Sequence, residues 1–282
     1  MYSVILENEN GDELKLTNNI NYAIDEIDGL YPSSATINTS NMSLFDGEKF
    51  TSSKVNKKQI TITFYIERNV EENRIALYKF IQPKEFIRFR YKNSNRDVYI
   101  DGYVESLDID IFTKKQFVTV AILCPNPYFR DASNQHTNVN AIDKKLVFPL
   151  ATPEPIPFGA YENISEIILE NKGDVATGMQ IEIHATGTVR NPIIYNSVTK
   201  AFFKLNYTMK AGEIIYVSTY KGRKTVKTLI DGQYKNIFNS IEKGSSWLQL
   251  KVGTNILTYD ADVEDEKNMH VDFIYQNLYR GV

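Results

Sequence analysis

Five acidic residues gather near the C-terminal end of the sequence: Asp260, Asp262, Glu264, Asp265 and Glu266. Carboxylate oxygens are the ligands that calcium prefers, so calcium binding is one interpretation of this run. The run lacks the glycine and the distal glutamate of an EF-hand loop. A solvated loop between two strands is therefore the favoured interpretation, and we predict no metal site here.

The other residues that could hold metals or move protons are scattered. His136, His184 and His270 lie in different segments without metal-ligand spacing, and His184 falls within an expected strand. Packed or surface imidazoles are the favoured interpretation. Asp108 and Asp110 alternate with apolar residues. This alternation is ordinary for a strand, which we favour over an acid/base pair. We therefore predict no catalytic residues.

An aromatic group in the second half of the chain could bind a sugar. Trp247 together with Tyr195, Tyr216 and Tyr220 could form a stacking platform, and Lys221 begins a basic hairpin tip. A single tryptophan in an alternating stretch such as WLQLKV more often belongs to a core. Trp247, Tyr220 and Lys221 are kept as candidate contacts to a sugar or a partner protein.

Composition narrows the functional classes further. The chain has 282 residues, a formal net charge of −3 and one cysteine, Cys124. Near-neutral charge gives no reason to expect sequence-specific nucleic-acid binding, and the single cysteine excludes an intrachain disulfide. No Walker, Rossmann or zinc-protease motif appears, so we expect no cofactor. No long apolar run indicates a membrane span, and the N-terminus predicts no signal peptide, so synthesis in a cytoplasm is expected.

The clearest local pattern runs from Val55 to Ile81. Alternation in ITITFYI predicts a strand with one buried face. Asn69 is placed to cap a following helix with its side chain, and Pro83 follows the end of that helix. The helix is expected to bury one stripe, formed by Val70, Leu77, Tyr78 and Ile81.

The rest of the first domain, residues 1–130, reads as an antiparallel β domain with this one helix. A hairpin is expected around Asn10 and Gly11, and the segment Asp25–Ser53 reads as an arm that packs against a neighbour. Four further strands are expected, with QFVTVAILC apolar on both faces and therefore central. They are Phe86–Tyr91, Val98–Val104, Leu107–Ile111 and Gln116–Cys124.

A change in amino-acid composition marks the expected domain boundary. Residues 131–160 are rich in Asn, Asp, Ser and Pro and read as a linker. From residue 161 to residue 282, short strands recur at the spacing of a β-sandwich, separated by turns such as Lys221–Gly222. The stretch WLQLKV is one of the expected strands. The chain is thus predicted to be mainly β.

Several stretches together resemble the distal tail proteins of bacteriophages that infect Gram-positive bacteria. The resembling stretches are Asp28–Leu30 with SATINTS, FTSSKVNKKQITITF, ENRIALYKFIQPKEFIRFRY, RDVYIDGYVES, CPNPYF, the segment from Trp247 to Asn255, and the terminal Leu278–Val282. They keep the family's order over nearly the whole chain.

The resemblance implies a ring-forming N-terminal domain, usually hexameric, and a galectin-like C-terminal β-sandwich. Implied partners are the major tail tube protein, a tail-associated protein and receptor-binding or baseplate proteins, at the tail tip of the virion. Asp28, Gly29, Leu30, Ala35 and Ile37 are the expected subunit-interface residues. An adhesion module that binds cell-wall sugars through the second domain is the alternative, and a glycosidase is a third hypothesis.

Overall fold

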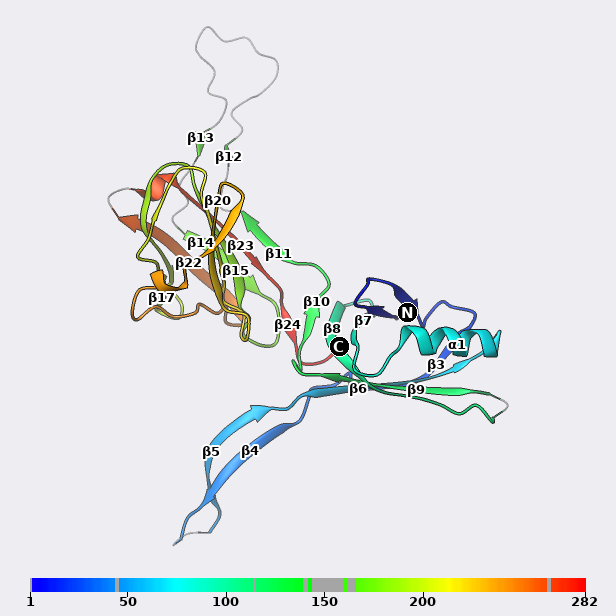
Figure 1. Cartoon of the computed structure of the whole chain (residues 1–282). Helices are drawn as coiled ribbons and strands as arrows, with labels where there is room; N and C mark the ends of the chain where they lie inside the picture. Colours follow the sequence, from blue (N-terminus) through cyan, green and yellow to red (C-terminus); the bar gives the residue numbers. More distant parts are fainter. Residues whose placement is uncertain are drawn as a thin grey trace. The chain divides into compact units, whose positions relative to one another are not determined.

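The computed structural model describes residues 2–43, 46–113, 115–138, 142–143, 160–161, 166–262 and 265–282. The chain forms two units (Figure 1). The first holds Met1–Ala132 and Leu278–Val282, and the second holds Ser133–Asn277. The proline-rich part of the expected linker, including Pro149 and Pro153, lies outside the described residues. The expected mainly β class is confirmed.

The first unit is built on a nine-stranded antiparallel sheet. Its main path runs β2–β1–β7–β8–β9–β6–β3; β10 also pairs with β8, and β24 pairs with β10. The strands are β1 (Ser3–Asn8), β2 (Glu13–Lys15), β3 (Tyr22–Asp28), β6 (Lys58–Ile66), β7 (Phe86–Lys92), β8 (Asp97–Ile109), β9 (Phe117–Cys124), β10 (Phe129–Asp131) and β24 (Leu278–Tyr279).

Alternation of apolar residues creates the core of this unit. Ile60, Ile62 and Phe64 are fully buried, and the polar residues between them are not, as the sequence predicts. Strand β9 lies inside the sheet, between β8 and β6. The two strands expected at 98–104 and 107–111 are one strand, β8. An irregularity between Val104 and Ser106 changes which residues face the core, while β8 stays paired with β9. The sequence pattern therefore looked like two strands.

The single α-helix among the described residues, α1 (Val70–Phe80), packs Leu77 into this core, and Ile81 just beyond its end is buried too. Two details of the prediction are wrong. Asn69 precedes the helix in the left-handed conformation and its side chain makes no capping hydrogen bond. Tyr78 is 47% exposed, because it lies beside the buried stripe rather than on it.

The N-terminal hairpin is confirmed, with Leu6 opposite Leu14 in β1 and β2. The expected arm has different bounds. Its first residues belong to β3, which pairs with β6 at the edge of the sheet. The following residues form a separate two-stranded hairpin, β4 (Ala35–Asn41) with β5 (Glu48–Val55). We call β4–β5 the arm hairpin; it projects from the sheet of the first unit in Figure 1.

The second unit is a β-sandwich. One sheet has the order β11–β23–β15–β19–β20–β21, and the other has the order β14–β22–β16–β17 with β18 beside β16. The strands are β11 (Gln135–Asn138), β14 (Glu166–Asn171), β15 (Met179–Ala185), β16 (Val189–Asn196), β17 (Ala201–Lys204), β18 (Thr208–Met209), β19 (Ile214–Ser218), β20 (Thr225–Ile230), β21 (Gln233–Asn236), β22 (Gly253–Asp262) and β23 (Met269–Tyr275). A short pair, β12 (Ile142–Asp143) with β13 (Ala160–Tyr161), and two 3-10 helices, η1 (Phe238–Ser240) and η2 (Asp265–Asn268), complete the described elements.

The core of the sandwich takes side chains from both sheets, among them Ile183 and Phe273 from one and Leu257 and Phe203 from the other. The expected galectin-like sandwich is confirmed. The stretch WLQLKV is not a strand: Leu248 and Leu250 are buried, but the backbone makes only an isolated bridge between Leu250 and Thr177. Here the side chains alternate between buried and less buried positions, although the backbone does not pair with a neighbouring strand.

Candidate interaction surfaces

The arm hairpin is the most exposed element of the first unit. Every residue of β4 and of β5 is exposed. Polar side chains join its two strands, for example through the hydrogen bond of 2.9 Å from the Asn38 amide to the Ser52 hydroxyl. Large apolar side chains are nevertheless exposed on it: Ile37 is 65% exposed, Phe50 60% and Val55 43%.

The register of the hairpin gathers these apolar residues on one face. Ala35 lies opposite Val55, and Ile37 is two residues further along β4 on the same face. An irregularity between Asn38 and Thr39 places Phe50 opposite Thr39, and therefore on the face that carries Ile37. We call Ala35, Ile37, Phe50 and Val55 the apolar arm face.

A buried lysine holds the base of the arm. Lys58 in β6 is 3% exposed, and its ammonium group donates hydrogen bonds to the carbonyl oxygens of Gly29, at 3.1 Å, and Tyr31, at 2.5 Å. The ring of Phe129 lies 5.2 Å from the same nitrogen. Burial lowers the pKa of Lys58, which the nearby Cys124 partly offsets. The charge is thus held in place by carbonyl oxygens and a ring face.

The C-terminal residues close over the same loop. The backbone N–H of Val282 donates to the carbonyl oxygen of Leu30 at 3.0 Å, and Arg96 donates to the carbonyl oxygen of Gly281. The guanidinium of Arg96 also lies 4.3 Å from the ring of Tyr279. The loop that leads into the arm is therefore fixed from two sides.

The five expected interface residues divide into two groups. Gly29 is buried and Leu30 is half-buried against the unit's own core, so both support the base of the arm, beside the exposed Asp28. Ala35 and Ile37 lie on the apolar arm face. Sequence reasoning missed Phe50 and Val55; isolated apolar residues within FTSSKV were the available signal.

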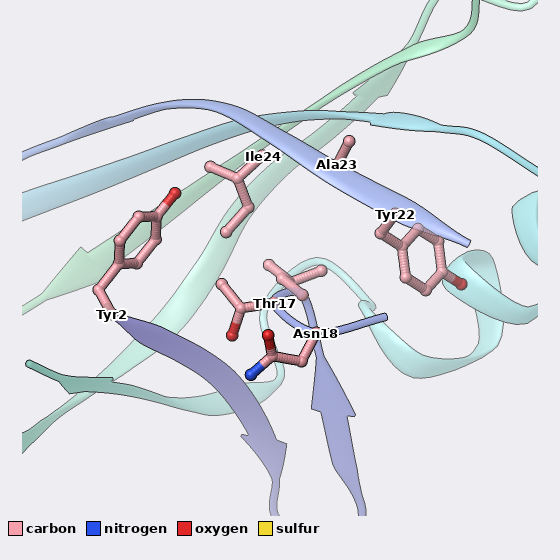
Figure 2. A pocket seen from close by; sticks show the side chains of 7 residues that line it. Tyr2, Thr17, Asn18, Tyr22, Ala23 and Ile24 are labelled. Atoms are coloured by element: carbon pink, nitrogen blue, oxygen red, sulfur yellow. The ribbon is translucent and has the colours of Figure 1, made fainter. Parts of the chain in front are cut away.

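A shallow pocket of about 340 Å³ lies where the two edges of the curved sheet approach one another. Figure 2 shows Tyr2 at the start of β1, Thr17 and Asn18 after β2, and Ala23 and Ile24 on β3 around it. Its lining, completed by Leu16 and Tyr22, has no carboxylate, imidazole or ammonium group. The pocket therefore suits an uncharged side chain rather than acid/base chemistry.

In the second unit, the residues of the suggested sugar platform are not brought together. Tyr195 lies on β16 and Tyr216 on β19, which belong to different sheets. Trp247 packs against the core, with Phe203 at 5.4 Å and Phe238 at 5.7 Å between ring centroids. The ammonium group of Lys224 lies 5.2 Å from its ring. Tyr220 is half-buried and Lys221 is exposed at the tip of the β19–β20 hairpin.

Residues 172–279 match the family model described as "Siphovirus-type tail component, C-terminal domain". The matched residues make up most of the second unit. No protein with a curated description matches its sequence.

Solved structures share the fold of the whole chain. The Dit protein of phage SPP1, described as a paradigm of the hub adsorption apparatus in phages infecting Gram-positive bacteria, is similar over 99% of both chains, with a TM-score of 0.69 and 13% identity. Two structures of the phage P2 baseplate in its activated conformation, with Ca and with Sr, each contain a chain similar over 98% of both chains, with a TM-score of 0.54 and 11% identity.

The acidic run near the C-terminal end of the second unit is only partly a solvated loop. Asp265 begins η2 and is 8% exposed, and its carboxylate accepts a hydrogen bond of 3.1 Å from the backbone N–H of Arg190. Asp262 accepts one of 2.6 Å from the Asn191 side chain. Glu264 lies outside the described residues. These carboxylates join η2 and β22 to the bend in β16.

Two histidines of the second unit that are far apart in sequence lie opposite each other on paired strands. His184 on β15 lies opposite His270 on β23, and Glu182 lies opposite Asp272. Burial lowers the pKa of His270; the neighbouring His184 lowers it further, and Asp272 opposes this. His136 is exposed on β11. Strand pairing, which sequence spacing does not reveal, created this group.

Proposed function

We propose that this chain is a structural protein of the phage tail tip. It forms a ring, with six copies as the expected number, that joins the tail tube to the tail-associated protein and to the receptor-binding or baseplate proteins. The siphovirus-type tail domain and the shared fold with a hub protein and a baseplate protein support this role. The apolar arm face is the single observation that carries the proposal for the ring.

The argument for the ring starts from the stability of the arm. A two-stranded hairpin without a hydrophobic face to pack on is marginally stable in water. The arm hairpin has such a face, and none of its residues is covered by the chain itself. Exposed apolar patches on projecting elements mark interaction sites. A partner that covers Ile37, Phe50 and Val55 would supply the missing packing.

A second copy of the chain is the occupant that we infer. An arm that packs on a different surface of the next subunit makes a heterologous contact, and such contacts close into rings when the rotation permits. Strand β3 is an edge of the first unit's sheet, and exposed edges are managed by pairing or covering them. Each subunit would then cover an arm and have its own arm covered.

The role is structural and not catalytic in this proposal. The pocket between the sheet edges lacks acid/base groups, and the family model describes a tail component. None of the helices in the described part of the chain combines the length and apolar character that a bilayer span needs. The protein would be made in the cytoplasm of the bacterial host and end at the tail tip of the virion.

The sugar-binding alternative receives no support from Trp247, because protein side chains contact its ring. A glycan array with the full chain tests it directly. Binding that disappears in Trp247→Phe while the fold is retained would favour an adhesion module over a ring component.

Electron cryomicroscopy of the native particle tests the proposed place in the virion. We expect density for a ring of this protein where the tube meets the tip, with the arm hairpin of one subunit lying on the next. A particle whose ring position is filled by another protein would contradict the proposal.

A further inference from the structure

The outer face of the six-stranded sheet carries a group of metal-ligating side chains. Along β15, buried residues alternate with half-buried ones, and Gln180, Glu182 and His184 share the half-buried side. The neighbouring strand β23 places Asp272 directly opposite Glu182. Antiparallel pairing therefore brings one imidazole and two carboxylates to a single spot.

The two distances from His184 to the carboxylates are short enough for one ion. The Nε2 atom of His184 lies 3.3 Å from a carboxylate oxygen of Asp272 and 3.8 Å from one of Glu182. One ligand atom from each of the three residues lies within 4.8 Å of the others. Two ligands of a zinc ion, each about 2.1 Å from it, are separated by at most about 4.2 Å. Both distances from His184 meet that limit as the side chains stand.

The hydrogen bonds around the group leave Nε2 of His184 and Oε2 of Glu182 available to bind an ion. Nε2 of His184 is buried and has no hydrogen-bond partner, because its short contact with Asp272 does not have hydrogen-bond geometry. The amide of Gln180 donates at 2.6 Å to Oε1 of Glu182. It is the other oxygen, Oε2, that faces His184. Gln180 therefore orients Glu182 as an outer-shell partner orients a metal ligand.

We propose that Glu182, His184 and Asp272 bind a divalent transition-metal ion, with zinc as the expected class. Imidazole favours zinc, nickel or copper over magnesium and calcium, and the two carboxylates balance the ion's charge. The three protein ligands leave a fourth position to water or to another molecule. The ion would join β15 to β23, which are neighbours in the six-stranded sheet. Its binding to the folded chain would therefore stabilise the second unit.

The test uses the untagged full-length chain, since a polyhistidine tag would itself bind metal. The chain is treated with chelator and then titrated with Co²⁺, whose visible absorption reports ligand geometry, and with Zn²⁺ by calorimetry. Glu182→Gln and Asp272→Asn keep side-chain volume while removing a charged ligand. His136→Gln, on exposed β11 of the same sheet, is the matched control. Circular dichroism confirms that each variant is folded.

We expect one equivalent of metal to bind, a rise in the unfolding temperature of the second unit, and a loss of affinity of about tenfold or more in each ligand variant. The His136→Gln variant should bind as the unchanged chain does. Absence of binding, binding that survives both ligand variants, or binding confined to Ca²⁺ and Mg²⁺ would overturn the proposal. If one ligand variant fails to fold, the other and His184→Gln decide the result.

Discussion

The buried ammonium group of Lys58 donates a hydrogen bond of 3.1 Å to the backbone carbonyl oxygen of Gly29. This contact ties β6, the neighbour of the edge strand β3, to the loop from which the arm leaves the sheet. The carbonyl oxygen of Leu30 is tied in turn to Val282. Lys58 and the C-terminal residue Val282 therefore both fix the loop that leads into the element that we propose to make the subunit contact.

Lys58→Ala is expected to destabilise the first unit by about 2 kcal/mol, because it leaves the carbonyl oxygens of Gly29 and Tyr31 without this donor. The exposed neighbour Lys57 offers the matched control, Lys57→Ala, which should change stability by less than about 0.5 kcal/mol. Urea unfolding followed through the reactivity of Cys124, the only cysteine and a buried one in the first unit, measures the difference. Equal midpoints for the two variants would contradict this role of Lys58.

Gly29→Ala should be far more harmful than the same change at Gly47. Both glycines have positive φ, +87° and +93°. A Cβ at residue 29 would lie 2.1 Å from the backbone oxygen of Gln59, whereas one at residue 47 meets nothing within 4 Å. We expect the first variant to lose more than about 3 kcal/mol and the second about 1 kcal/mol. Similar losses at the two positions would show that backbone conformation, and not contact with β6, decides the cost.

Removing residues 280–282 should weaken the first unit alone. The deletion removes the acceptor for Arg96 and the donor to Leu30. Cys124 labelling should then occur at lower urea concentration. Fluorescence of Trp247, the only tryptophan and part of the second unit, should keep its midpoint. A shift of the Trp247 transition as large as that of Cys124 would contradict this division.

Stability in alkaline solution should depend on Cys124. Burial raises the pKa of its thiol from 9.0 to about 12. Between those values the folded chain holds a proton that the unfolded chain releases, so the free energy of unfolding falls as pH rises, by up to about 1.4 kcal/mol per pH unit. Denaturation at pH 9 and pH 10 should show a smaller decrease for Cys124→Ala than for the unchanged chain. Equal slopes would indicate that the thiol does not contribute.

Much of the fold was predictable because the spacing of apolar residues in the sequence matches the pattern of buried side chains. Ile60 to Ile66 alternate in sequence and in burial, and Leu77 and Ile81 fall on one helical stripe. The errors arose where the local pattern of apolar residues does not match the pairing of the strands. The bulge near Glu105 made β8 resemble two strands, and the alternation in WLQLKV reflects burial without a ladder.

The surfaces were less predictable than the fold. Ile37 was recognised within its polar segment, but Phe50 joins its face only through the register and its irregularity. Likewise Glu182 and Asp272 are 90 positions apart and meet because β15 pairs with β23. Residue spacing along one strand carries no information about which residue lies opposite.

The apolar arm face makes the central claim directly testable by sedimentation velocity over a range of concentrations. The full chain should associate toward a closed species of sixfold the 32.4 kDa subunit mass. Ile37→Asp with Phe50→Asp should stay monomeric, while Thr36→Asp with Asn38→Asp, on the opposite face of β4, should still associate. A full chain that remains monomeric at every concentration, or a ring that forms despite charges at Ile37 and Phe50, would contradict the account.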